Sequence, residues 1–125
     1  MQQSLQQKLY NAPQDRVFDG VTDAFLSQCG KGLSYIGSVV LRRSIWFETE
    51  RRPYYGSYFA HVAVLLKSPS LQRILLTHEP YLRYRSGNSS WTARSFEIWN
   101  FKWPELVWGI GRLSPQSKAL VTPRE

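Results

Sequence analysis

Residues 58–67, YFAHVAVLLK, form the stretch that organises the predicted fold. It contains the longest apolar run of the chain, from Phe59 to Leu66. Large apolar side chains recur there at helical spacing, at Phe59, Val62, Leu65 and Leu66. This spacing predicts a helix over 58–67 with one buried face, begun by Ser57 as the cap and ended by Pro69.

Upstream of this helix, the sequence predicts a buried strand over Ser34–Arg42, because SYIGSVVLR is rich in β-branched residues. Ser44 is expected to cap a short helical turn through Phe47. Asp23–Cys29 is expected to be a short helix, with Thr22 as its cap and Gly30 as its stop. Residues 1–22 are polar and weakly patterned, so no element is predicted there.

Downstream, Gln72–Thr77 is predicted to be a strand, and the alternation in Tyr81–Arg85 predicts an edge strand beside it. A helix is expected from Trp91 to about Trp103. Pro104 would then start another helix that ends near Gly111. Ser114 and Pro115 would start one more helix, which we expect to be too short to pack well.

The composition is that of a globular domain. Of the 125 residues, 42% are hydrophobic, 20% are charged and 14% are aromatic. This length suits a single domain over 1–125 with one core. The lone cysteine, Cys29, excludes an internal disulfide and a cysteine-based zinc site. A net charge of +7 favours anionic partners without choosing among them.

No targeting or spanning segment is visible in the sequence. The first seven residues lack an apolar region, and no apolar run approaches the roughly 20 residues needed to cross a bilayer. We therefore expect a cytoplasmic location, with the inner membrane face left open as a second one. Trp99, Trp103 and Lys102 are compatible with a contact to anionic lipid, although such aromatic stripes usually pack in a core.

Three segments resemble the family 2 glycosyltransferases, in the right order and with the right spacing. They are YIGSVVLRRSIWFE from Tyr35, YYGSYFAHVAVLL from Tyr54 and RILLTHEPYLRYRSGNSSW from Arg73. The similarity covers about residues 33–103, and the nearest group is the abequosyltransferase-like enzymes of O-antigen synthesis. The resemblance implies an α/β, GT-A-like C-terminal subdomain with a small mixed sheet and flanking helices.

The resemblance further implies transfer of a sugar from a nucleotide-sugar donor to a glycan or lipid-linked acceptor, in surface polysaccharide synthesis. In that family a divalent metal, Mn or Mg, is held by an Asp-x-Asp motif in the nucleotide-binding half. That half and its motif have no counterpart here. The chain alone is therefore expected to hold no metal and to be inactive without the missing half.

The transfer needs a base for the acceptor hydroxyl and cations for the leaving diphosphate. His61 is the first candidate base, and Glu48 and Glu50 are alternatives. Each has a structural interpretation: His61 bonded to a backbone carbonyl, and the two carboxylates as exposed loop charges.

The candidate substrate-binding residues form two groups. The first would grip phosphate through charge-assisted hydrogen bonds and comprises Arg43, Arg83, Arg85, Asn88 and Ser89. A solvated edge strand protected by charge is the structural alternative for Arg83 and Arg85. The second group would stack on a sugar ring and comprises Tyr54, Tyr55 and Tyr58. Partial burial between helix and loop is the alternative for these tyrosines.

A different function also fits the composition: a non-catalytic basic module that binds anionic glycan or nucleic acid. Charge and aromatic content favour it. Nucleic acid is not the expected partner, however, because the basic residues are dispersed and no nucleic-acid motif occurs.

Overall fold

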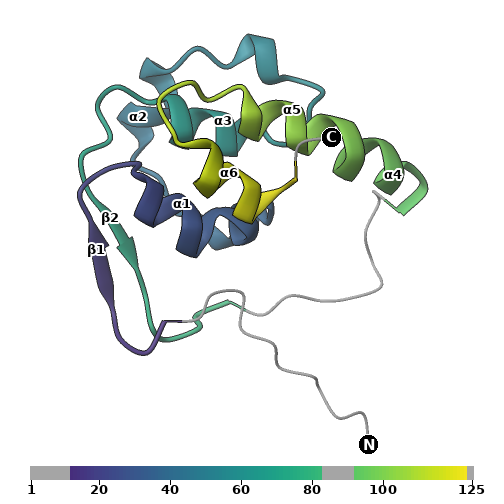
Figure 1. The fold of residues 1–125 in the computed structure, drawn as a ribbon. Helices are drawn as coiled ribbons and strands as arrows, with labels where there is room; N and C mark the ends of the chain where they lie inside the picture. The colour runs from purple at the N-terminus through teal and green to yellow at the C-terminus, as the bar shows by residue number, and fades with distance from the viewer. Residues whose placement is uncertain (1–11, 83–91, 124–125) are drawn as a thin grey trace, which may run out of the picture.

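The helix α3, Ala60–Lys67, lies at the centre of the computed structural model, which describes residues 12–82 and 92–123 (Figure 1). The Ser57 hydroxyl accepts a hydrogen bond from the Phe59 N–H at 3.2 Å, but the N-cap of α3 is Phe59 and no side chain caps it, so the prediction that Ser57 caps this helix is wrong. Every residue from His61 to Leu66 is buried. The predicted helix and the predicted burial of its apolar face are therefore confirmed, and the burial extends beyond that face to His61, Ala63 and Val64.

The helices α1, Asp23–Cys29, and α6, Pro115–Val121, lie side by side (Figure 1). Thr22 caps α1 as predicted, accepting from the Phe25 N–H at 3.3 Å, and Ser114 caps α6 in the same way. Because Ser117, Lys118 and Val121 are buried, the expectation that α6 packs poorly is wrong.

Residues 92–108 form one continuous helical run instead of two helices. It consists of η4, Thr92–Arg94, α4, Ser95–Glu97, a π-helical turn η5, Ile98–Lys102, and α5, Trp103–Trp108. Pro104 has no N–H to donate to the preceding turn, and its ring crowds that turn's carbonyls. The wide turn η5 immediately before it lets the run continue, so the expected break at Pro104 is wrong.

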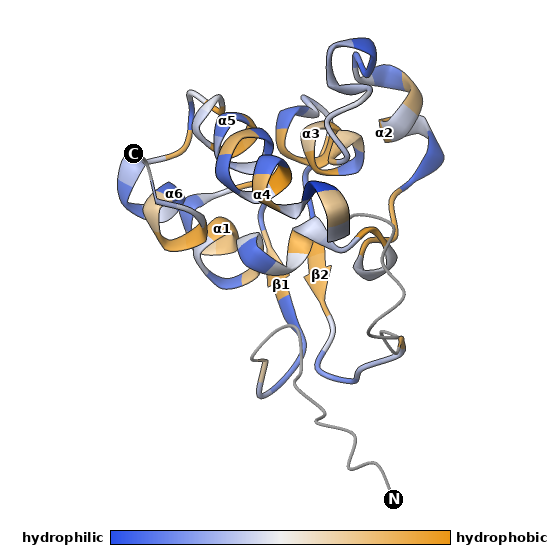
Figure 2. Cartoon of the chain, turned by 90° about the vertical axis from the view of Figure 1, so that its right-hand side faces the viewer, coloured by the Kyte–Doolittle hydropathy of each residue, from blue (hydrophilic) through white to orange (hydrophobic). Residues whose placement is uncertain are grey.

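The sheet has two antiparallel strands, β1, Arg16–Phe18, and β2, Ile74–Leu76. Strand β2 falls within the predicted Gln72–Thr77 strand and is hydrophobic throughout (Figure 2). Strand β1 falls in the segment where no element was expected. The described chain is thus a helix-rich α/β structure, and its sheet is antiparallel where a mixed one was expected.

The predicted strand Ser34–Arg42 is wrong. Two short 3₁₀ helices, η1, Gly30–Ser34, and η2, Ile36–Ser38, occupy its first half, and Val40 is 98% exposed. The helix α2, Arg43–Glu48, follows close to the expected turn, although Ser44 lies inside it and does not cap it. Tyr81 and Leu82 are not in a strand, and the rest of Tyr81–Arg85 lies outside the described residues.

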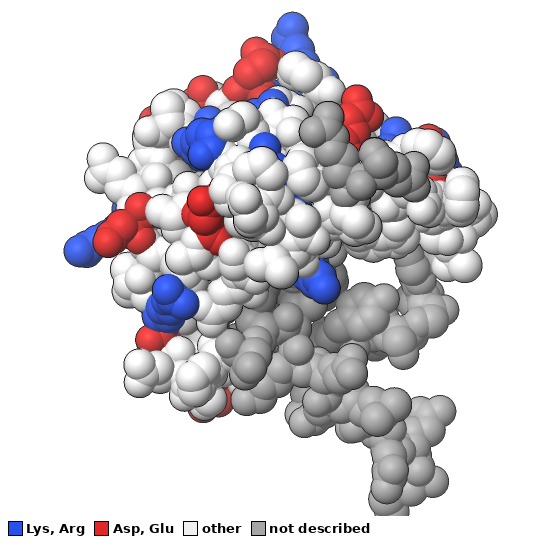
Figure 3. Space-filling model, in the orientation of Figure 1, with Lys and Arg blue, Asp and Glu red and all other residues white. Residues whose placement is uncertain are grey.

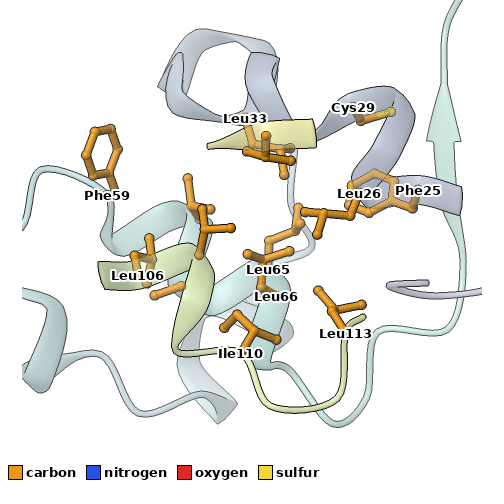
Figure 4. Close-up of a cluster of buried hydrophobic side chains, with 14 of the residues drawn as sticks. Phe25, Leu26, Cys29, Leu33, Phe59, Leu65, Leu66, Leu106, Ile110 and Leu113 are labelled. Atoms are coloured by element: carbon orange, nitrogen blue, oxygen red, sulfur yellow. The ribbon is translucent and has the colours of Figure 1, made fainter. Parts of the chain in front are cut away.

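The core joins side chains from all of the longer helices. Phe25 and Leu26 of α1 meet Leu65 and Leu66 of α3, and Leu113 closes the cluster before α6 (Figure 4). Phe59 is fully buried against Trp103, with ring centroids 4.8 Å apart. In the described ranges, no helix is long and apolar enough to span a bilayer.

Candidate functional site

An open pocket of about 310 Å³ lies where the loop before α3 meets α2 and η2. Its walls are mainly aromatic, formed by Trp46, Tyr54, Tyr55 and Tyr58, with His61 among them. Ile36, Gly56 and Ala60 complete the lining. We call this site the aromatic pocket. Its size is at the lower end of the roughly 300–1,000 Å³ typical of small-molecule sites.

The loop that supplies the tyrosines is shaped by its own backbone bonds. The 3₁₀ turn η3, Arg52–Tyr54, contains Pro53, and the Tyr54 carbonyl accepts from the Ser57 N–H at 3.1 Å and from the Ser57 hydroxyl at 2.6 Å. Gly56 then adopts φ +86°, which a residue without a side chain tolerates. Together these features turn the chain sharply between η3 and α3 and place Tyr54, Tyr55 and Tyr58 around one hollow.

Tyr58 has an unusual backbone conformation. Its φ of 69° lies in the left-handed region, where no other non-glycine residue of the described chain is found. Its hydroxyl accepts a hydrogen bond from Arg94 Nη1 at 2.5 Å, and Lys102 Nζ donates to the Gly56 carbonyl at 3.1 Å. The helical run 92–108 therefore holds this wall of the pocket in place.

His61 is buried and fixed in orientation. Its Nε2 lies 2.8 Å from the Leu33 carbonyl oxygen, which can only accept, so the proton belongs on Nε2 and Nδ1 is the basic nitrogen. Burial lowers the pKa of the His61 imidazole, while the bond to Leu33 acts in the opposite direction. The ring is consequently neutral at neutral pH.

The two carboxylates proposed as alternative bases do not line the aromatic pocket. Glu48 accepts a hydrogen bond from the Ser70 hydroxyl at 2.7 Å, and Glu50 accepts from the Arg52 N–H at 3.1 Å. Arg43 does not line the pocket either. Its guanidinium lies over the ring of Phe47 on α2 instead, 5.2 Å from the ring centroid. The structure thus brings His61 together with Tyr54, Tyr55 and Tyr58, and leaves Arg43, Glu48 and Glu50 apart from them.

Four predicted phosphate-binding residues, Arg83, Arg85, Asn88 and Ser89, lie outside the described residues. Conversely, Trp46 and Ile36 line the aromatic pocket without having been proposed for it. The sequence feature that pointed to Trp46 as a lining residue was the helical turn predicted after Ser44, because this turn brings the Trp46 indole near the loop that carries the tyrosines. Ile36 gave no such signal, because its segment was expected to be a strand.

Of the two tryptophans considered for a membrane contact, Trp103 is internal and Trp99 is 42% exposed. Trp103 is buried, Trp99 packs on Phe59 with centroids 5.8 Å apart, and the Trp108 indole donates to the Thr122 carbonyl at 3.0 Å. Cys29 is also internal, and burial raises the pKa of its thiol to about 11. It is therefore a protonated core side chain.

Charged side chains are mixed on the surface. On the face drawn in Figure 3, Lys and Arg lie singly, with Asp and Glu between them. Within residues 12–82 and 92–123, no three His, Cys, Asp or Glu side chains lie close enough together to hold a metal ion.

No family model matches the chain, and no curated protein or solved structure matches it.

Proposed function

We propose that this chain is the acceptor-side part of a sugar-nucleotide glycosyltransferase and that the aromatic pocket binds the acceptor sugar. The observation that carries the proposal is the grouping of His61 with Tyr54, Tyr55 and Tyr58 around one open hollow. Flat aromatic rings with a polar group suit the apolar C–H face of a pyranose and its hydroxyls. The same residues stand in the segment that resembles the acceptor-side helix of family 2 enzymes.

His61 has the properties of a base for the acceptor hydroxyl. Its Nε2 hydrogen is committed to the Leu33 carbonyl, so the free lone pair is on Nδ1. Because burial keeps the imidazole neutral, this lone pair is available at neutral pH. An acceptor hydroxyl within hydrogen-bond reach of Nδ1 would lose its proton to it as the new glycosidic bond forms.

A second function is favoured by one specific observation. Among the described residues that line the aromatic pocket, none is Asp or Glu, and the two nearby glutamates bond elsewhere. A pocket of this composition also suits a non-catalytic module that binds glycan. Both functions require a saccharide in the pocket, so the first experiment tests that requirement.

The test is an NMR titration of the chain with methyl glycosides and short oligosaccharides, followed at the Trp46 indole N–H. We expect saturable shifts, and Tyr55→Ala should weaken binding about two- to tenfold, as expected for the loss of one aromatic contact. Tyr55 is 61% exposed, so its truncation should leave the fold intact.

Tyr81→Ala is the matched control, because Tyr81 is 77% exposed and does not line the aromatic pocket. Absence of saturable shifts with every saccharide would exclude the proposal, as would equal weakening by the two substitutions. Because the chain alone is expected to be inactive, transfer of labelled sugar from nucleotide donors with Mn²⁺ is measured after a nucleotide-binding half has been joined to it, and this assay separates a transferase from a binding module.

A further inference from the structure

Three rings of the aromatic pocket each have a cation over them. The charged group of Arg51 lies 5.2 Å from the Trp46 ring centroid, and that of Lys67 lies 4.8 Å from the Tyr54 ring centroid. The Tyr58 ring has two cations, Arg94 at 5.4 Å and Lys102 at 5.9 Å from its centroid. None of these four cations lines the pocket itself. They therefore contribute charge around the pocket, while its inner surface stays aromatic.

The acidic side chains of the described residues neutralise this charge only in part. Glu97 pairs with Arg94 at 2.8 Å and with Lys102 at 3.7 Å. In the described part of the chain, no salt bridge is made by Arg51 or by Lys67. Glu48 and Glu50 also lie nearby, but they bond to the Ser70 hydroxyl and to the Arg52 N–H and form no salt bridge with these cations. Four cations against the carboxylates of Glu48, Glu50 and Glu97 leave the surroundings of the pocket with a small net positive charge.

The strained turn at Tyr58 is a separate observation that marks the same place. A tyrosine at φ 69° persists only where its surroundings fix it, and such conformations cluster at binding sites. Here the fixing groups are two of the four cations: Arg94 bonds the Tyr58 hydroxyl and Lys102 bonds the Gly56 carbonyl. The cations thus shape the pocket as well as charge it.

We infer that the aromatic pocket takes a negatively charged sugar unit, one that carries a carboxylate or a phosphate monoester. The inference rests on the proposed function and names its substrate class. The C–H face of the sugar packs on the rings, and the anionic group is attracted by Arg51 and Lys67, whose charges lie 5.2 and 4.8 Å from the Trp46 and Tyr54 ring centroids and make no salt bridge within the described residues. A volume of about 310 Å³ holds one such unit.

The experiment compares methyl glucuronide with methyl glucoside, which has the same ring without the charge, and with inorganic phosphate alone. Binding is followed by NMR at the Trp46 indole and the Tyr58 ring, at low and at high NaCl. We expect the glucuronide to bind about three- to tenfold more tightly than the glucoside at low salt. We expect most of this preference to be lost in about 0.5 M NaCl, because salt screens charges that are exposed.

Lys67→Met tests the source of the preference, because Lys67 is exposed and methionine keeps an unbranched chain over Tyr54. It should lower the affinity for the glucuronide about two- to threefold and leave that for the glucoside unchanged. Arg16→Gln removes the same charge near Phe18, a ring that does not line the pocket, and should change neither affinity.

The outcomes separate this inference from the proposed function. Equal affinity for the two glycosides would overturn the inference and leave the proposed function standing. Shifts from inorganic phosphate that match those from the glucuronide would show that the pocket recognises an anion without the sugar. That result would also overturn the inference. If neither the two glycosides nor any oligosaccharide bound, both the inference and the proposed function would be overturned.

Discussion

Gly30 positions two helices through the side chain that it lacks. It lies where α1 passes into η1, and its φ of −54° is one that any residue adopts. A β-carbon placed on it would lie 2.3 Å from Val121 Cγ2 on α6, far inside van der Waals contact. Glycine is thus required at this position for the close approach of α1 and α6, and not for an unusual backbone conformation.

Gly30→Ala should therefore destabilise the chain by about 1–3 kcal/mol, because Val121 and its neighbours must shift to admit a methyl group. Gly111→Ala is the matched control, since a β-carbon there meets nothing within 4 Å, and it should change the free energy of unfolding by less than about 0.5 kcal/mol. Urea unfolding measures both. Equal effects of the two substitutions would contradict the close-packing explanation.

Single residues with a strong local role were predictable from the sequence. Thr22 and Ser114 cap α1 and α6 because a hydroxyl just before a helix accepts from its first N–H groups, whatever surrounds it. The role of Gly30 was not predictable. Its position suggested a helix stop, and the side chain that excludes a methyl group there is 91 positions away in the sequence.

At the scale of elements, α1 and α6 are joined through one carboxylate. Asp23 Oδ1 accepts from the Ser114 N–H at 2.8 Å and from the Ser117 hydroxyl at 2.9 Å. Both groups stand at the start of α6, and Asp23 itself is the first residue of α1. These hydrogen bonds, led by the one from the Ser114 backbone, lower the pKa of Asp23 from its usual 3.8.

Asp23→Asn should lower the melting temperature at pH 7, because the ionised carboxylate accepts these bonds more strongly than an amide does. A carboxyl whose pKa is depressed in the folded state stabilises it above pH 3.8, and this contribution is lost as the pH falls through the folded-state pKa. The difference in melting temperature between the two proteins should therefore shrink on acidification. Asp19→Asn, at an exposed aspartate before α1, is the control and should show no such difference.

Helices and strands were predictable where the residue types of a segment and the hydrogen bonds that it makes in the fold favour the same structure. For Ser34–Arg42 they did not agree: its β-branched residues favoured a strand, yet the Ser38 hydroxyl donates to the Gly32 carbonyl at 3.1 Å and to the Tyr35 carbonyl at 2.7 Å. These local bonds fix 3₁₀ turns in place of a strand. Strand β1 gave no signal because two of its three residues, Arg16 and Val17, are exposed.

At the scale of the whole molecule, the candidate site was predictable only in part. His61, Tyr54, Tyr55 and Tyr58 come from one continuous segment, so their proximity follows from a single sharp turn. The cations around them come from α3, from the loop after α2 and from the helical run 92–108. No pattern within one segment could indicate that these parts of the chain meet.

The C-terminal helix should decide whether the whole domain folds. Without α6, the core loses Val121, Asp23 loses both hydrogen-bond donors, and the Trp108 indole loses the Thr122 carbonyl. A domain of this size has little stability in reserve, so a chain ending at Leu113 should show no cooperative thermal unfolding by circular dichroism. A chain ending at Pro123 keeps all of these contacts and should melt as the full chain does. Cooperative melting of the shorter chain within about 5 °C of the full chain would mean that α6 is dispensable.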